Sequence, residues 1–325
     1  MRGKRTKWSG LTAVIIAAGL AAGCDGSGVR DTGAMADREV SAPNSEASAD
    51  SFARTIHHLN GDTKIAQRPV NIAVPYVGFV DYLAVLDTYP VAAQGMTAVS
   101  RNFPNLNKRL AGHSIMDLGM EVDMEKLLAS QPDIIIAADD MSDKYEQLSR
   151  IAPTVVLPQA GEWRETLKQI ARVIGQEAKA DDVLAEFDRK SEQYRAKLAF
   201  RSDQSVLFVM YNGKEQFVSW PEERFEPFYR GLGLKPVPGA AKGGTLSLES
   251  LSSLRPDHLF VINNWSNPIQ GGVKEALKDN KVWNSIEAVK NDRVYYLSDP
   301  SIAGPMALAK IDGIEEIVNA MGKPD

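Results

Sequence analysis

The chain has 325 residues, of which 44% are hydrophobic and 24% charged, and this length corresponds to about two domains. The composition is typical of a globular protein and excludes a disordered or collagen-like chain. The net charge of −5 argues against a nucleic-acid-binding protein, whose surface would be basic. The single cysteine excludes an intramolecular disulfide, and four histidines leave little material for a transition-metal cluster.

The N-terminus has the features of an export signal. Four basic residues within the first seven precede an apolar stretch, residues 11–22, which is shorter than the roughly 20 residues of a membrane-spanning helix. Small residues then lead to the single cysteine in Ala21-Ala22-Gly23-Cys24. We expect a signal peptide over residues 1–23. The alternative is an ordinary secreted protein with an unmodified cysteine.

Residues 24–52 predict a flexible tether. Between residues 25 and 51 the only larger apolar side chains are those of Val29, Met35 and Val40, and small or acidic residues dominate the rest. Such a segment buries too little apolar surface to fold by itself. The sequence therefore predicts that the folded part begins near residue 53.

Strands alternate with helices in residues 53–160, and this alternation predicts parallel βαβ units. The segment opens with two short strands around Asn60-Gly61, a strong signal for a two-residue hairpin turn. The further strands expected here are 70–74, 91–94, 133–137 and 154–157, and the expected helices are 80–86, 123–130 and 142–151.

Residues 161–200 predict helices alone. Apolar residues recur at helical spacing from Leu167 to Ile174, and Gly175 ends this first helix. Residues 180–198 then predict one helix of about 28 Å at 1.5 Å per residue.

The alternation resumes in residues 201–325. The expected strands are 205–211, 258–263 and 293–297, and the expected helices are 225–231 and 305–321. We therefore expect an α/β fold of two Rossmann-like lobes, residues 53–160 and 201–325, joined by the long helix of the linking segment 161–200.

An internal repeat relates the two lobes. Residues 123–137 (DMEKLLASQPDIIIA) and 247–261 (SLESLSSLRPDHLFV) both contain Glu-x-Leu-x-x-x-x-Pro-Asp followed by an apolar strand. Asp123 and Ser247 are favourable N-cap residues, so Glu125 and Glu249 fall at the second position of each helix. We infer two lobes of similar construction, each presenting a glutamate at the same place.

With these segments the sequence resembles the iron-siderophore branch of ABC-transporter substrate-binding proteins, which are class III periplasmic binding proteins. The branch includes ferric-hydroxamate-binding proteins and, more distantly, the vitamin B12-binding protein. The resemblance covers about residues 54–322, and Ala21–Cys24 resembles the lipobox of bacterial lipoproteins. The resemblance to the siderophore-binding proteins rests on the segments RTIHHLNGDTKIAQRPVNIAV, EKLLASQPDIII, YEQLSRIAPTVVL, WRETLKQIARVIG, LESLSSLRPDHLFV and VWNSIEAVKNDRVYYL.

This resemblance implies a ligand cleft between two lobes bridged by a rigid helix. It further implies that Glu125 and Glu249 dock into arginine pockets of a permease dimer. The alternative for each glutamate is a favourable interaction with its helix dipole, worth about 0.3–1 kcal/mol. The resemblance to lipoproteins implies a diacylated Cys24 that anchors the protein to the extracytoplasmic face of the cell membrane. We expect a monomer.

A ferric siderophore fills the coordination shell of iron with its own oxygens, so the resemblance implies neither a protein metal ligand nor a cofactor. Such a ligand requires aromatic surface and cationic or hydroxyl donors, at the carboxyl ends of strands. By this position we predict Tyr76, Arg101, Tyr211 and Trp265 as cleft residues. Their alternatives are strand-end packing for the aromatic residues and a solvated loop charge for Arg101.

Trp220 and Arg224 lie before a predicted helix, where ferric-hydroxamate-binding proteins have a tryptophan and an arginine. The resemblance therefore adds both to the predicted ligand-binding residues. Core packing is the alternative for Trp220, and an ion pair with Glu222 or Glu223 is the alternative for Arg224. The small number of candidate arginines favours a hydroxamate over a catecholate siderophore, since a trianionic complex would suit a basic cluster.

The sequence contains no Gly-x-Ser-x-Gly, Gly-x-Gly-x-x-Gly or P-loop motif, so we predict a binding protein and not an enzyme. The expected function is capture of a ferric siderophore for an ABC importer. Haem, cobalamin or another metal chelate on the same fold is the alternative cargo, and an anchored hydrolase is a more distant alternative.

Overall fold

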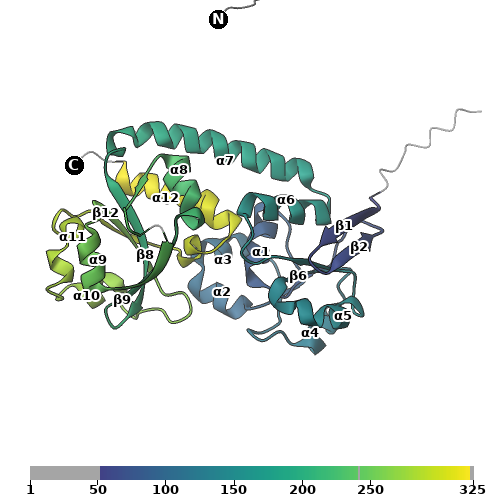
Figure 1. The fold of residues 1–325 in the computed structure, drawn as a ribbon. Coiled ribbons are helices and arrows are strands. Elements are labelled where there is room, and N and C mark those ends of the chain that lie inside the picture. The colour runs from purple at the N-terminus through teal and green to yellow at the C-terminus, as the bar shows by residue number, and fades with distance from the viewer. Residues whose placement is uncertain (1–51, 241, 323–325) are drawn as a thin grey trace, which may run out of the picture. The chain divides into compact units, whose positions relative to one another are not determined.

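The computed structural model describes residues 52–240 and 242–322 (Figure 1). The predicted signal peptide, Cys24 and all but the last residue of the predicted tether lie outside the described residues. The boundaries proposed at residues 160 and 200 stay predictions, and the sheets and helices on either side of them are as follows.

The first lobe contains a five-stranded parallel sheet in the order β5-β4-β3-β6-β7. An antiparallel hairpin of β1 (Arg54–His58) and β2 (Gly61–Ile65) precedes it, as the Asn60-Gly61 turn predicts. The strands of the sheet are β3 (Ile72–Val74), β4 (Ala92–Ala93), β5 (Met116–Asp117), β6 (Ile134–Ala138) and β7 (Thr154–Leu157). The helices are α1 (Val77–Val85), α2 (Met96–Asn102), α3 (Pro104–Leu110), α4 (Met124–Ala129), the 3-10 helix η1 (Asp139–Lys144) and α5 (Tyr145–Ser149).

The second lobe contains a six-stranded mixed sheet in the order β11-β9-β8-β12-β13, with β10 beside β8. Its strands are β8 (Ser205–Gly213), β9 (Gln216–Pro221), β10 (Lys235–Pro236), β11 (Lys242–Ser247), β12 (His258–Asn263) and β13 (Val294–Leu297). Its helices are η3 (Glu222–Phe225), α8 (Glu226–Leu232), α9 (Leu248–Leu254), α10 (Val273–Leu277), η4 (Trp283–Ser285), α11 (Glu287–Lys290), η5 (Pro300–Ala303) and α12 (Ala307–Met321).

The sheet of the second lobe is mixed, because β9 is antiparallel to both β8 and β11. A tight turn reverses the chain after β8, and Gly213, Lys214 and Glu215 in it have φ of 83°, 51° and 60°. Gly213 pairs with Gln216, so the loop consists of Lys214 and Glu215, which are both left-handed as a two-residue hairpin turn requires.

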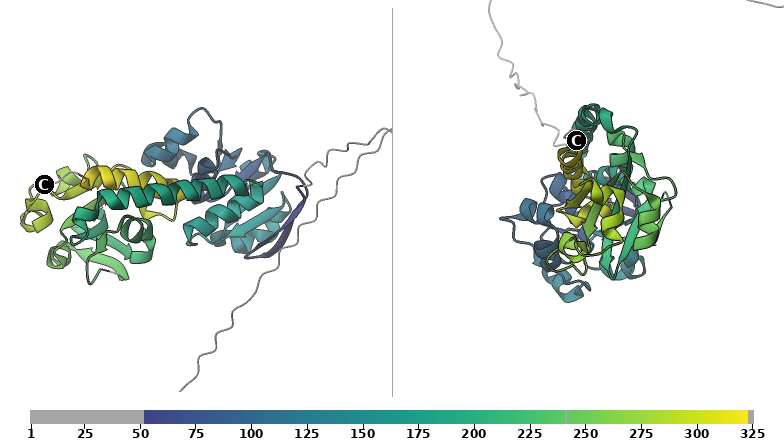
Figure 2. Two further views of the ribbon diagram at one scale, coloured as in Figure 1. Left: turned by 90° about the horizontal axis from the view of Figure 1, so that it is seen from above. Right: turned by 90° about the vertical axis from the view of Figure 1, so that its left-hand side faces the viewer.

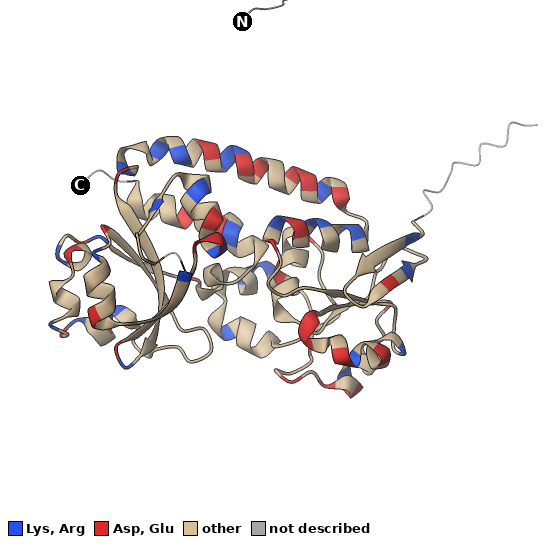
Figure 3. Ribbon diagram, viewed as in Figure 1, with Lys and Arg blue, Asp and Glu red and all other residues tan. Residues whose placement is uncertain are grey.

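Two consecutive helices link the lobes. α6 (Trp163–Ile174) ends at Gly175, whose φ of 72° is left-handed, as the sequence predicts. α7 (Glu177–Lys197) then runs for 21 residues, or roughly 31 Å, and contacts α6 as well as α8 and α12 of the second lobe (Figures 1 and 2). A helix η2 (Ala199–Arg201) follows it. Acidic and basic residues are interspersed along α7 (Figure 3), and Leu184 and Phe187 are among its buried residues.

The sequence repeat forms equivalent structure in the two lobes. α4 leads to β6, which lies between β3 and β7, and α9 leads to β12, which lies between β8 and β13. In the first lobe the carboxylate of Asp133 accepts hydrogen bonds from the backbone N–H groups of Val70 and Asn71. In the second lobe the carboxylate of Asp257 accepts one from the backbone N–H of Ser205. The Pro-Asp pair therefore fixes the start of the neighbouring strand in each lobe.

The largest cluster of buried side chains is shared by the two lobes, and α12 lies within it. The N-terminus of α12 is held by the first lobe: Asp81 of α1 is 1% exposed, and its Oδ1 accepts a hydrogen bond of 2.7 Å from Leu308 N. The hydroxyl of Tyr82 donates to the carbonyl of Pro305. Asp299 accepts a hydrogen bond of 2.9 Å from Asn105 N of α3.

The Asp81 carboxyl predicts a pH-dependent stability. Burial raises the pKa of Asp81 from 3.8 to about 8, although the hydrogen bond from the backbone N–H of Leu308 acts in the opposite direction and lowers it. The native state therefore holds this proton more tightly than the unfolded chain, and the resulting stability, present below about pH 4, is lost as pH rises through about 8. In Asp81→Asn this dependence should be absent, so the variant should gain stability relative to the wild type from pH 5 to pH 8.

Urea unfolding of both proteins at several pH values measures this difference. The comparison with the variant is needed because Lys310 contributes in the opposite direction. Burial lowers the pKa of Lys310 to about 7, so its share of the stability is lost as pH falls through that value. A constant difference between wild type and variant over the whole range would contradict the prediction.

Candidate functional site

A cavity of about 680 Å³ lies where the two lobes meet. Its lining comes from residues 160–164 at the start of α6, from residues between 221 and 230 in η3 and α8, and from Pro305. The charged side chains of the lining are three arginines and three glutamates, namely Arg164, Arg224, Arg230, Glu162, Glu223 and Glu226. Because the end of the first lobe and the linking segment form one side of it and the second lobe forms the other, this cavity is the candidate functional site.

Arg224 differs from the other two arginines of the cavity. Arg164 forms an ion pair with Asp188 of α7, and Arg230 lies 3.8 Å from Glu226. Arg224 forms no ion pair with any carboxylate in the described part of the chain, and its Nη1 donates to the carbonyl of Ala303 at 3.2 Å. Its guanidinium therefore retains donors for an oxygen-rich ligand.

Tyr76 precedes α1 and lies near Arg224. Its ring packs edge-on against Phe79, with centroids 4.9 Å apart, and a Cβ at Gly78 would approach the ring within 2.5 Å. Burial and then the charge of Asp140 raise the pKa of the Tyr76 hydroxyl, while Arg224 acts in the opposite direction. The structure thus brings Tyr76 of one lobe into electrostatic range of Arg224 of the other.

Trp220 is half-buried and lies within β9, a strand that was not predicted from the sequence. Its ring packs on Phe225 with centroids 5.6 Å apart. A Cβ at Gly243, whose φ is 67°, would lie 2.6 Å from the Trp220 carbonyl carbon, so β11 passes close to it. Trp220 is next to Pro221, which lines the cavity.

Arg101 and Trp265 lie at another contact between the lobes. Arg101 is exposed at the end of α2, whereas the sequence predicts it in a loop. The following Asn102 donates a hydrogen bond of 2.8 Å to the carbonyl of Trp265, and the rings of Phe103 and Trp265 are 5.9 Å apart. Trp265 remains 38% exposed.

Tyr211 does not lie with these residues. It is 5% exposed and packs on Phe217 in the hydrophobic core of the second lobe. Successive side chains of a strand face opposite sides, and Tyr211 shares the side of Leu207 and Val209. Its position at the end of a strand predicts that Tyr211 lies in the cleft, whereas in the structure its ring packs in the core.

Glu125 and Glu249 occupy matching positions in the two lobes. Each is exposed and is the second residue of its helix, as the repeat predicts. Asp123 caps α4 by accepting from Glu125 N and Lys126 N, and Ser247 caps α9. The backbone N–H of Glu249 and the Ser247 hydroxyl hold the pKa of the Glu249 carboxyl below its usual range.

Four charged residues of this region were not predicted from the sequence. Asp139 and Asp140 follow β6 directly, and their charges raise the pKa of the Tyr76 hydroxyl. Their position directly after a strand is the signal that could have indicated them. Arg164 and Arg230 also line the cavity. They lie on helices, where the rule that places ligand residues after strands does not find them.

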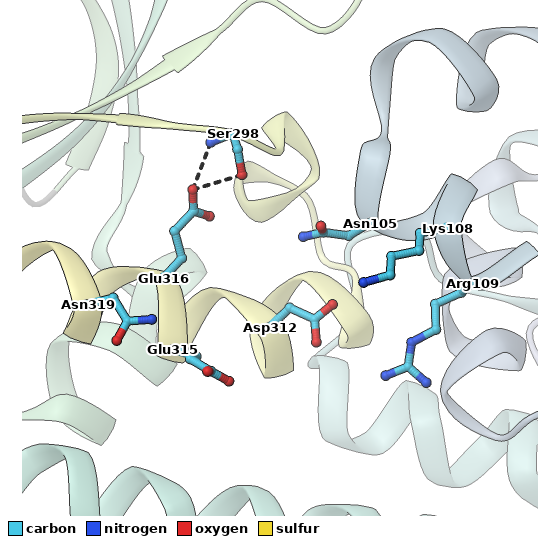
Figure 4. A pocket seen from close by; sticks show the side chains of 8 residues that line it. All are labelled: Asn105, Lys108, Arg109, Ser298, Asp312, Glu315, Glu316 and Asn319. Atoms are coloured by element: carbon cyan, nitrogen blue, oxygen red, sulfur yellow. Dashed lines mark hydrogen bonds between the residues drawn. The ribbon is translucent and has the colours of Figure 1, made fainter.

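A second cavity, of about 770 Å³, separates α3 from α12 (Figure 4). In it Lys108 and Arg109 of α3 lie across from Asp312 and Glu315 of α12, and Glu316 accepts hydrogen bonds from Ser298. It contains no aromatic side chain and none of the sequence-predicted residues, so we do not assign the site there.

Two further observations concern the described residues alone. Within 52–240 and 242–322, no three histidine, cysteine or acidic side chains come together in a way that could hold a metal ion. No helix in these ranges has the length and apolar composition needed to span a bilayer.

Comparison with known proteins agrees with this architecture. The sequence profile of the periplasmic binding protein family matches residues 100–300. The iron-uptake system-binding protein of Bacillus subtilis is 31% identical over 240 residues, which are 70% of this chain and 74% of that protein.

Two solved structures from Bacillus subtilis show the same fold. One is a periplasmic binding protein component of a Fep/Fec-like ferrichrome ABC transporter, with 26% identity and a TM-score of 0.70 over 82% of this chain and 99% of that one. The other is the triscatecholate siderophore binding protein FeuA with ferri-bacillibactin, with 24% identity and a TM-score of 0.69 over 82% and 98%. With these matches and the two-lobed fold, the chain belongs to the periplasmic binding protein family.

Proposed function

We propose that this protein is the substrate-binding component of an ABC importer and that it captures a ferric siderophore. The observation that carries the proposal is the cavity of about 680 Å³ between the lobes, a volume within the range of roughly 300–1,000 Å³ for small-molecule sites. Arg224 contributes donors without a carboxylate partner among the described residues, and Tyr76 and Trp220 contribute aromatic surface nearby. This combination suits an organic chelate whose oxygens carry negative charge.

A hydroxamate siderophore fits this site better than a catecholate. Two of the three cavity arginines are ion-paired, and three glutamates share the lining, so the site has no strong excess of positive charge. A ferric tris-hydroxamate core is neutral, whereas a tris-catecholate complex is a trianion that would require a basic pocket. The similar solved structures include both a component of a ferrichrome transporter and a triscatecholate siderophore binding protein, so the preference rests on the charge of the cavity lining.

The protein would act by binding alone, because the chelate supplies every ligand of the iron. Its relatives are binding proteins, and we propose neither a cofactor nor a catalytic step. Delivery would occur at the extracytoplasmic face of the membrane, with a lipid on Cys24 as the anchor and with Glu125 and Glu249 as the contacts to a permease dimer.

Titration of intrinsic tryptophan fluorescence with ferrichrome, ferri-bacillibactin, haem and cobalamin tests the proposal. We expect quenching by ferrichrome at submicromolar concentration, and a smaller amplitude in Trp220→Phe, since Trp220 would lie near the iron. Iron-free ferrichrome is the control for the organic shell. A response to haem or cobalamin alone would refute siderophore binding, and tighter binding of ferri-bacillibactin would refute the hydroxamate preference.

A further inference from the structure

Lys310 of α12 is 1% exposed, although a buried ammonium group is costly unless it is paired. Its Nζ donates hydrogen bonds of 2.9 Å to the carbonyl oxygens of Arg224 and Ile302. The ammonium also lies 5.0 and 5.3 Å from the ring centroids of Phe225 and Phe228. A methionine would fill similar space without the cost of removing a charge from water, so packing alone does not account for a lysine here.

The two carbonyls belong to the two turns that hold the cavity arginine. η3 carries Arg224 itself, and η5 carries Ile302 and Ala303. Lys310 links η3 to η5 by donating hydrogen bonds to a backbone carbonyl of each. The guanidinium of Arg224 provides a second link, because it donates to the carbonyl of Ala303 in η5. The main chain and the side chain of Arg224 are therefore both fixed to the same neighbouring turn.

The helix that carries Lys310 is also held by the other lobe. Asp81 accepts a hydrogen bond from Leu308 N, two residues before Lys310, and the Tyr82 hydroxyl donates to Pro305 O. A short buried path thus runs from α1 through the start of α12 and Lys310 to the backbone of Arg224.

We propose that Lys310 is a positioning residue for ligand binding, which holds Arg224 towards the cavity by joining the carbonyls of residues 224 and 302. The inference rests on the proposed function, since it gives Lys310 its role through a ligand that Arg224 contacts. Lys310 itself is not among the residues that line the cavity.

The test is a double-mutant cycle on the full chain, with ferrichrome or ferri-bacillibactin as the probe, whichever the wild type binds more tightly. Lys310→Met should weaken binding about tenfold or more, because it removes both hydrogen bonds that hold the backbone of Arg224 to η5. Arg224→Ala should weaken it by a similar factor. If Lys310 acts through Arg224, the double variant should bind no more weakly than Arg224→Ala alone. Lys190→Met, at a partly exposed lysine of α7 that does not line the cavity, is the control and should bind as the wild type does.

Thermal unfolding accompanies each titration, because an apolar replacement of a buried charge can leave stability unchanged. Should Lys310→Met fail to fold, Lys310→Arg and Lys310→Gln replace it. The arginine keeps the charge and two donors and should retain the wild-type affinity, while the glutamine should bind more weakly.

Three results would overturn the inference. They are wild-type affinity in Lys310→Met or Lys310→Gln, losses that multiply in the double variant, and binding of neither probe by the wild type. The last result refutes the proposed function together with this inference. The first two, obtained with a wild type that binds, refute the role of Lys310 alone.

Discussion

Charge reversal at Glu125 and Glu249 together should abolish uptake of the ferric siderophore and leave its affinity for the purified protein unchanged. Both carboxylates are exposed at the second position of equivalent helices, one in each lobe, and neither lines the cavity between the lobes. A pair of like charges at matching positions suits a partner with two matching cationic pockets. Radioiron uptake by cells with the cognate permease, and fluorescence titration of Glu125→Lys/Glu249→Lys, measure the two quantities.

The chain offers matched controls for the helix-dipole alternative. Glu146 and Glu287 also lie in the first turn of a helix, α5 in one lobe and α11 in the other. Reversal of these charges removes a comparable interaction with a helix dipole, so Glu146→Lys/Glu287→Lys should transport normally. Equal loss of uptake in both double variants, or loss of affinity in the first, would contradict the docking role.

The fold was predictable where a strong local pattern coincides with burial. β7 and β12 have the predicted limits, and α6 ends at Gly175, because an apolar run or a left-handed glycine determines each locally. α2, α3, β9 and β11 were missed. β11 consists largely of exposed residues with two glycines, and its place depends on pairing with β9, a tertiary contact without a periodic signature.

The candidate site was predictable only in part, because strand order tells which loops meet but not which side chains face inward. The charge of Arg224 in the second lobe lowers the pKa of the Tyr76 hydroxyl in the first lobe. Tyr211 also lies near the end of a strand. Successive side chains of β8 face opposite sides of the sheet, however, and this alternation places Tyr211 in the core. Lys310 and Asp81 were not predicted. The sequence does not show which carbonyls or which helix end a charged residue within an apolar helix will bind through hydrogen bonds.

Phe208→Ala should be the most destabilising of the substitutions considered, at about 3–5 kcal/mol, with a fall in Tm of roughly 10 °C. Phe208 lies in β8 at 1% exposure. Its ring stacks on Phe225 at 4.6 Å and on Phe260 at 4.9 Å, with Phe228 and Tyr229 at 5.6 and 5.4 Å. Removal leaves a cavity in the centre of this aromatic cluster. Calorimetry and urea unfolding measure the effect.

The control is Phe200→Ala, because Phe200 is 51% exposed and its loss should cost under about 1 kcal/mol. Similar stability of the two variants would contradict a central role for the cluster. The same substitution at Phe208 should also weaken ligand binding, since Phe225 is the last residue of η3 and stacks directly on Phe208. Lys310→Met should by contrast lower affinity with little loss of stability. The packing of η3 on the sheet and the hydrogen bonding of η3 to η5 are thus separable contributions to the position of Arg224.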